Sequence, residues 1–209
     1  MPKLYLLGGE NVYKRNALVI NEDAFKEAGE RPTVVVFPWA RASFDRAYPE
    51  RKLLSDYFFS LGATSVDFMD FSDSRQRIAE KIAVSGLIYL TGGLVSALVE
   101  RLRKSNVDSM LFDYRGVVVG RSAGALALCR RCVVTPRRSK KVRVIDGLGL
   151  ADLTLKAHYR RIKDEILLKL SQNEKIYAIP SRSAIVYDGA IQKIIGKAYV
   201  FENGVREIL

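Results

Sequence analysis

The amino-acid sequence predicts an α/β protein: a three-layer α/β/α fold with a mostly parallel, doubly wound sheet between two layers of helices. Short runs of aliphatic residues alternate with segments of helical periodicity through residues 3–128. Several apolar runs end in glycine or proline, as strands do where they meet a loop. With 209 residues and 48% hydrophobic content, the chain suits one well-buried core. We therefore expect residues 1–209 to form a single α/β domain with its site beyond the carboxyl ends of the parallel strands.

The expected elements alternate in chain order. Asn21 is expected to cap the first helix and Gly29 to end it, while Pro49 is expected to be the first residue of the second helix. We expect strands at 3–7, 33–37, 65–69, 87–90 and 117–119, and helices at 21–28, 49–61, 73–84, 94–103 and 108–114.

The last third of the chain has a different pattern. Residues 141–145 and 153–157 read as extended runs, and residues 159–171 as an amphipathic helix with Ile162, Ile166, Leu167 and Leu170 facing inward. Residues 175–209 form short apolar runs separated by Asp-Gly, Gly and Asn-Gly turns, which predict a hairpin meander. We expect these C-terminal strands to join the edge of the parallel sheet in antiparallel fashion.

The stretch Gly120-Arg121-Ser122-Ala123-Gly124 is the strongest chemical signal in the chain. A buried β-branched run leads into the serine, and helix formers follow it, so Ser122 is expected on a sharp strand-to-helix turn. Such a turn lifts a serine clear of the sheet, and glycines on both sides prevent crowding. The pattern predicts a nucleophile elbow. A glycine-lined turn with a capping serine is the alternative.

Composition limits the other classes of function. The longest apolar runs are too short for a membrane span, and Met1 leads directly into a strand pattern, so we expect a cytoplasmic protein without a signal peptide or membrane partner. Cys129 and Cys132 form one isolated Cys-x-x-Cys pair, and His158 is the only histidine. A structural zinc would need more ligands, so no metal and no cofactor are expected. We interpret the cysteines as ordinary thiols, with a facultative disulfide as the alternative.

The positive charge has a local source. Lysine and arginine exceed aspartate and glutamate by 11, and seven basic residues fall within residues 130–143. These residues are Arg130, Arg131, Arg137, Arg138, Lys140, Lys141 and Arg143. No aromatic side chains that could stack on bases are interleaved with them, which favours a solvated hairpin over a nucleic-acid surface.

With these motifs in place, the chain resembles the dipeptidase E and cyanophycinase-type serine peptidases, which share the fold of the class I glutamine amidotransferases. The resemblance covers nearly the whole length. It is carried by the segments Leu6-Leu7-Gly8-Gly9-Glu10, Ile88-Tyr89-Leu90-Thr91-Gly92-Gly93, Gly120-Arg121-Ser122-Ala123-Gly124-Ala125, Ala157-His158-Tyr159 and Ser183-Ala184-Ile185-Val186.

The resemblance implies a nucleophile at Ser122 and a general base at His158, and the chemistry of an unactivated hydroxyl requires such a base. A solitary histidine can also be purely structural. The oxyanion donors implied by the family are the N–H groups of Ala123 and Gly93, although Gly92 and Gly93 also suit a simple helix-entry turn.

The acids of the family are missing from their usual positions. Ser181 stands where the family commonly has a glutamate, and the arginine-rich run around Arg137 occupies the position of a second acid used by dipeptidase members. Lys156 replaces an aspartate often found two residues before the histidine, and Leu94-Val95 replaces an Asn-Thr pair. Ser181 is thus a candidate third member of the triad, and Asp146, Asp152 and Asp188 are candidates for a relocated acid.

Three classes of function follow. The first is a serine peptidase or dipeptidase that cleaves short peptides, with an acidic residue bound by Arg121, Arg160 or Arg161; each of these arginines can equally be an ordinary surface residue. The second is a catalytically impaired relative that binds ligands on the same scaffold. The third, ranked lowest, is a nucleic-acid-associated protein. Assembly into a homodimer is left open.

Overall fold

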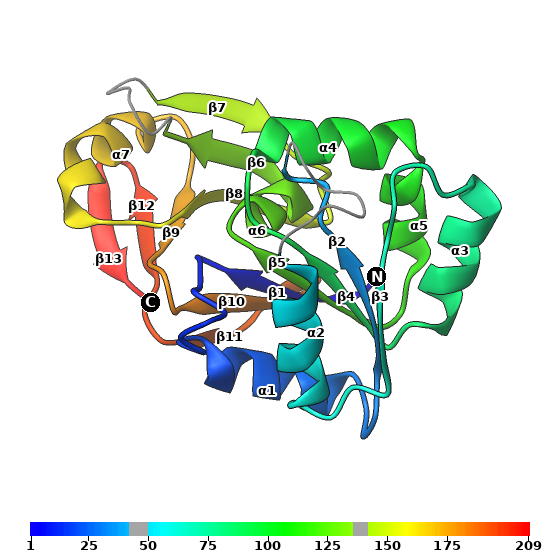
Figure 1. The fold of residues 1–209 in the computed structure, drawn as a ribbon. Coiled ribbons are helices and arrows are strands. Elements are labelled where there is room, and N and C mark those ends of the chain that lie inside the picture. Colours follow the sequence, from blue (N-terminus) through cyan, green and yellow to red (C-terminus); the bar gives the residue numbers. More distant parts are fainter. Residues whose placement is uncertain (42–49, 136–141) are drawn as a thin grey trace.

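The computed structural model describes residues 1–41, 50–135 and 142–209, and in it the chain builds two sheets flanked by helices (Figure 1). The first sheet has seven strands, and its middle strand is the one that leads to Ser122. In spatial order the strands are β11 (Ala190–Ile195), β10 (Ala184–Asp188), β1 (Lys3–Leu7), β5 (Val117–Arg121), β4 (Leu87–Leu90), β2 (Thr33–Phe37) and β3 (Ser65–Phe68). The five strands from β1 to β3 in this order are parallel, while β10 and β11 join antiparallel at the β1 edge. The mixed α/β fold and the added antiparallel strands were both predicted from the sequence.

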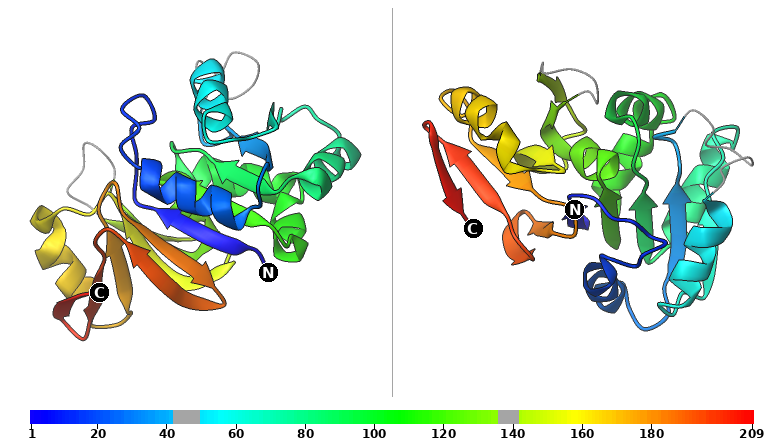
Figure 2. Two further views of the ribbon diagram at one scale, coloured as in Figure 1. Left: turned by 90° about the horizontal axis from the view of Figure 1, so that it is seen from below. Right: turned by 60° about the vertical axis from the view of Figure 1, so that its left-hand side comes forward.

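A second sheet of six strands was not predicted. Its spatial order is β13 (Val205–Ile208), β12 (Tyr199–Glu202), β9 (Ile176–Ile179), β8 (Ala151–Ala157), β6 (Cys129–Val134) and β7 (Arg143–Asp146). The prediction that all C-terminal strands extend the parallel sheet was therefore wrong for β9, β12 and β13. These strands lie at the end of the molecule farthest from α3 (Arg75–Val84) (Figure 2).

Helices cover both faces of the first sheet. Alternation along β1 sends Tyr5 and Leu7 into a core beneath α1 and α2, and Leu4 and Leu6 into a larger core lined by α3 to α6 and the second sheet. The helices are α1 (Leu18–Glu27), α2 (Arg51–Phe59), α3, α4 (Val95–Lys104), α5 (Val107–Asp113), α6 (Ala123–Leu128) and α7 (Asp164–Leu170), with a 3₁₀ turn η1 (Arg161–Lys163) before α7. No helix in the described ranges is both long and apolar enough to cross a membrane.

Two helix predictions need correction. Asn21 does not cap a helix, because α1 begins at Leu18 and Asn21 is a buried residue in its middle. The helix expected over residues 159–171 is shorter, since α7 begins only at Asp164 and Ile162 is 84% exposed on the preceding turn. Pro49, Arg137, Arg138, Lys140 and Lys141 lie outside the described residues, so the predictions made for them are not addressed by the structure.

Candidate active site

Ser122 is the single residue between β5 and α6. Its backbone is strained, with φ 55° and ψ −102°, a conformation that non-glycine residues rarely adopt and that concentrates at functional sites. The N–H of Ser122 donates to the carbonyl of Leu7 on β1 over 2.8 Å. A Cβ atom on Gly124 would lie 2.3 Å from the carbonyl oxygen of Leu90 on β4, so only glycine permits this close approach of α6 to the sheet.

His158 directly follows β8 of the second sheet, and its side chain meets Ser122, which directly follows β5 of the first sheet. Its Nε2 atom lies 2.7 Å from Oγ of Ser122. The backbone of His158 is also left-handed, with φ 51°, and its N–H donates to the carbonyl of Gly8 over 3.0 Å. The imidazole lies against the backbone of Gly9, where a Cβ atom would fall 2.1 Å from Cε1 of the ring. The glycine turn after β1 therefore leaves the space that the imidazole of His158 occupies.

Ser181 completes a row of three side chains. Its Oγ lies 2.9 Å from Nδ1 of His158, on the side of the ring that faces away from Ser122. Ser181 follows β9, and the next residue, Arg182, donates its N–H to the carbonyl of Gly9 over 2.8 Å. Gly8 and Gly9 thus bind the segments that carry His158 and Ser181, so this turn holds both residues in one geometry.

No carboxylate in the described part of the chain is bonded to His158, and the three alternative acids lie elsewhere. Asp152 forms an ion pair with Arg130 at 2.6 Å. Asp146 is an exposed residue opposite Arg131 on the edge strand β7, and Asp188 is exposed at the end of β10. The structure brings none of them to the ring.

The electrostatic surroundings of His158 favour the neutral imidazole. Partial burial lowers its pKa below the usual value, and the positive charges of Lys156 and Arg121 lower it further. A neutral ring can accept a proton from Ser122 near neutral pH, so the state needed for a general base is the one the surroundings favour. The same charges oppose the imidazolium that forms when the proton is taken.

The two predicted oxyanion donors are Ala123, which directly follows Ser122, and Gly93, which lies on the turn after β4. Ala123 is the first residue of α6, and within the described residues neither its N–H nor that of Gly93 has an acceptor. A Cβ atom on Gly92 would sit 3.4 Å from Cβ of Ser122, which places the turn after β4 directly against the serine. Gly93 in turn packs on Ala40, whose carbonyl accepts the N–H of Leu94 over 2.7 Å.

The arginines proposed for substrate binding differ in their surroundings. Arg121 is buried, and its guanidinium forms an ion pair with Glu50 at 3.2 Å, with its Cζ 5.9 Å from the centre of the Tyr89 ring. Arg160 and Arg161, which follow His158 by two and three residues, are exposed and have no ion-pair partner among the residues described. Their charges are therefore accessible to a ligand.

Sequence reasoning missed a half-buried acid beside the glycine turn, Glu10. The carboxylate of Glu10 accepts a short hydrogen bond from the hydroxyl of Tyr89 and another, at 3.0 Å, from Nδ2 of Asn21. Burial raises the pKa of Glu10, while these two donors and the charge of Arg121 oppose the rise. The sequence signal is the position of this acidic residue directly after Gly8-Gly9, in a segment for which no role of Glu10 was predicted. Glu10 anchors the chain immediately beyond the glycines that contact His158.

With this geometry established, comparison with known proteins identifies the family. The model of peptidase family S51 matches residues 4–195. The chain belongs to peptidase family S51. This membership supports the predicted relation to dipeptidase E and a serine peptidase as the general class of enzyme.

Curated relatives of this family S51 chain match it at low sequence identity. An uncharacterized peptidase of Listeria innocua is 23% identical over 139 residues, a match that spans 60% of this chain and 66% of the relative. An uncharacterized peptidase of Listeria monocytogenes is 23% identical over 143 residues, spanning 62% of this chain and 70% of the relative. Thus the match covers just under two thirds of the first relative's length.

Two crystal structures extend the comparison to the whole chain. The structure of a peptidase from an acI-B1 actinobacterium superposes with a TM-score of 0.73 at 19% identity, covering 100% of the S51 chain and 94% of the other. A candidate peptidase E protein of Listeria monocytogenes gives a TM-score of 0.68 at 21% identity, with coverages of 100% and 99%. At these identities the likeness concerns the fold.

Other features of this S51 peptidase have structural roles. Within the described ranges no group of histidine, cysteine, aspartate and glutamate side chains is arranged to hold a metal ion. Cys129 and Cys132 are buried free thiols whose Sγ atoms donate to the carbonyls of Ala125 and Leu126, and burial raises both pKa values. Both interactions stabilise the junction of α6 and β6.

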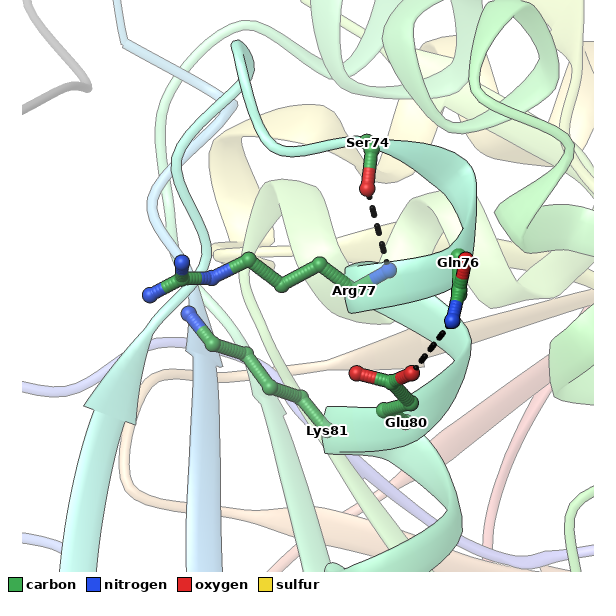
Figure 3. Close-up of a pocket in the computed structure, with 5 residues that line it drawn as sticks. All are labelled: Ser74, Gln76, Arg77, Glu80 and Lys81. Atoms are coloured by element: carbon green, nitrogen blue, oxygen red, sulfur yellow. Dashed lines mark hydrogen bonds between the residues drawn. The ribbon is translucent and has the colours of Figure 1, made fainter.

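A surface hollow beside α3 offers no comparable chemistry (Figure 3). Its polar side chains bond to one another or to the adjacent Asp73: the hydroxyl of Ser74 accepts the N–H of Arg77, and Gln76 donates to Glu80. These contacts cap and stabilise a helix at the far edge of the sheet.

Proposed function

We propose that this S51 peptidase hydrolyses short peptides with Ser122 as nucleophile and His158 as general base. The observation that carries the proposal is the 2.7 Å contact between Oγ of Ser122 and Nε2 of His158. Two residues 36 positions apart, each in a strained positive-φ conformation, meet at hydrogen-bond distance. Backbone strain at two residues whose side chains are in contact is typical of a catalytic pair, and this strain has no evident structural purpose.

The proposed reaction follows from these contacts. Nε2 of His158 removes the hydroxyl proton as Oγ of Ser122 attacks the scissile carbonyl carbon, and the resulting oxyanion accepts hydrogen bonds from the N–H groups of Ala123 and Gly93. The imidazolium then donates the proton to the leaving amine, which leaves an acyl-enzyme. Water, deprotonated by the same nitrogen, hydrolyses this ester and restores the serine.

Ser181 is the proposed third member of the site. Its hydroxyl oxygen can accept the N–H of Nδ1 and so hold His158 in the tautomer that leaves Nε2 free to take a proton. A hydroxyl supplies no negative charge to stabilise the imidazolium. Loss of the triad carboxylate costs about four orders of magnitude in turnover in a well-studied triad. We therefore propose a slow hydrolase.

The substrate is proposed to carry an acidic residue at the cleaved bond. Arg160 and Arg161 are exposed, are close in sequence to His158 and lack an ion-pair partner among the described residues, so they can bind a carboxylate as a fork. Arg121 is a less direct candidate, because its charge is already paired with Glu50 inside the protein. The net charge of +11 also attracts acidic peptides over longer distances.

Hydrolysis of matched dipeptides tests this proposal. Asp-Leu and Asn-Leu differ by a charge at nearly equal size, and the release of free leucine measures turnover. We expect slow cleavage of Asp-Leu, weaker cleavage of Asn-Leu and none by Ser122→Ala. Saturable binding of Asp-Leu without cleavage, and without a difference between wild type and Ser122→Ala, would instead support the ligand-binding function that the missing carboxylate favours.

A further inference from the structure

Lys156 is a buried cation two residues before His158, and the proposed reaction assigns it no step. Alternation along β8 sends Leu155 and Ala157 into the main core and Lys156 to the opposite face, where its backbone is paired with Ala178 of β9. That face packs against a smaller apolar core, which contains Ala178, Leu167 and Phe201. Only 6% of Lys156 is exposed.

Among the described residues, the ammonium group of Lys156 makes one hydrogen bond, to the carbonyl oxygen of Ala157 over 2.8 Å. This carbonyl belongs to the peptide that joins Ala157 to His158. The same peptide supplies the N–H that donates to Gly8, and it precedes the positive-φ conformation of His158. Lys156 therefore restrains one side of a peptide whose other side is restrained by Gly8, and the position of the imidazole depends on both restraints.

No carboxylate compensates the charge of Lys156 in the described part of the chain. The nearby acids have other partners: Asp164 of α7 binds Tyr159 and Arg206, and Glu174 before β9 binds Thr154 and Arg131. Lys163 of η1 is the charged group that acts on Lys156 among the described residues, and Lys156 in turn acts on the imidazole of His158. Burial, with a smaller effect of Lys163, lowers the pKa of Lys156 to about 8. It is therefore mostly protonated at neutral pH.

We propose that Lys156 is a positioning residue for His158, which fixes the peptide that carries the imidazole and opposes protonation of the ring with an uncompensated charge. The first effect aligns Nε2 with Ser122. The second keeps the resting base neutral but disfavours the imidazolium formed during attack, an unfavourable contribution that Ser181 does not offset. This inference rests on the proposed function for its catalytic consequence, whereas its effect on the histidine can be measured without any activity.

The test uses the fact that His158 is the only histidine in the chain, so its imidazole NMR signals need no assignment. The pKa of His158 is measured by titration in the wild type, Lys156→Met, Lys156→Gln and a control, Lys169→Met, which removes an exposed lysine paired with Glu165 on α7. We expect both Lys156 variants to raise the pKa of His158 and the control to leave it unchanged. An unchanged pKa in both Lys156 variants would overturn the electrostatic part of the inference.

The two replacements also separate charge from hydrogen bonding. Glutamine retains an N–H donor for the Ala157 carbonyl, while methionine does not. The rate at which a fluorophosphonate labels Ser122 should therefore be about tenfold lower in Lys156→Met than in Lys156→Gln, since small displacements of a catalytic group have large effects. Equal rates in the two variants would overturn the positioning part. If wild-type Ser122 is not labelled at all, the proposed function fails, and the NMR titration still decides the effect of the charge.

Discussion

Gly9→Ala is expected to disable His158 without a proportionate loss of stability. The added Cβ atom would lie 2.1 Å from Cε1, 2.6 Å from Nδ1 and 3.0 Å from Nε2 of the imidazole. Carbon atoms need about 3.5 Å, so the ring has to move by about 1.4 Å or the turn has to shift. Either change breaks the 2.7 Å contact with Ser122. Misplacement of a catalytic group by about 1 Å costs roughly 10²-fold in rate.

The assay is the second-order rate of fluorophosphonate labelling of Ser122, which needs no known substrate. Gly29→Ala is the matched control, because Gly29 also has a positive φ of 105° but would place its Cβ atom in open space. Both variants should lose about 1–3 kcal/mol of folding free energy from backbone strain, measured by denaturant unfolding. Only Gly9→Ala should label roughly 10²-fold more slowly. Labelling of Gly9→Ala at the wild-type rate would refute the claim that the imidazole must pack closely on Gly9 to activate Ser122.

Three further predictions concern the same site. Ser181→Glu should raise turnover of Asp-Leu at least about tenfold, a part of the roughly 10⁴-fold contributed by a triad carboxylate, and a fall in turnover would show that this position no longer accepts an acid. Because the pKa of His158 is lowered, the wild-type labelling rate should fall with decreasing pH with a midpoint below the ordinary histidine value of 6.5. Ser181→Glu should move this midpoint to higher pH, and a wild-type midpoint above 6.5 would contradict the shift. Arg160→Ala together with Arg161→Ala should raise KM for Asp-Leu about tenfold or more and leave KM for Asn-Leu nearly unchanged, and equal effects on both dipeptides would exclude these arginines as the carboxylate site.

Local patterns in the sequence predicted the first sheet, whereas the meeting of Ser122 with His158 was predicted from the family resemblance and from the need of a serine nucleophile for a base. The buried run of β5 and the glycines around Ser122 specify a strand, a sharp turn and a helix, and each of these depends only on neighbouring residues. The carboxyl ends of parallel strands share one edge, so the glycine turns after β1 and β4 were expected at the same edge as Ser122. In the structure Gly92 packs against Ser122 and Gly9 against His158.

The features that were not predicted depend on partners far away in the sequence. Arg130 and Arg131 make β6 look like part of a polar hairpin. In the structure Arg131 pairs with Glu174, and the consecutive residues Cys132 and Val133 enter buried cores on opposite faces of the strand. Asn21 has the chemistry of a helix cap, but its side chain is satisfied inside the protein by Glu10 and Tyr57. No local pattern reveals such long-range hydrogen bonds.

The helix after His158 was misread for a related reason. Ile162 fits the apolar periodicity of residues 159–171, but the backbone leaves β8 through a positive-φ residue and a 3₁₀ turn before α7 begins. The sharp turn that aims His158 at Ser122 delays the helix and leaves Ile162 exposed. The backbone turn that positions His158 therefore prevents a helix from forming where the apolar periodicity predicts one.

Covalent labelling of Ser122 tests the central claim most directly. The protein is incubated with a fluorophosphonate, and intact mass spectrometry followed by peptide mapping locates the adduct; Ser122→Ala, Ser181→Ala and a sample denatured before labelling serve as controls. We expect one adduct per chain, on Ser122, slowed but not abolished by Ser181→Ala and absent from the other two samples. If folded wild-type protein acquires no adduct on Ser122, or labels no faster than its denatured form, His158 does not activate the serine and the hydrolase account is wrong.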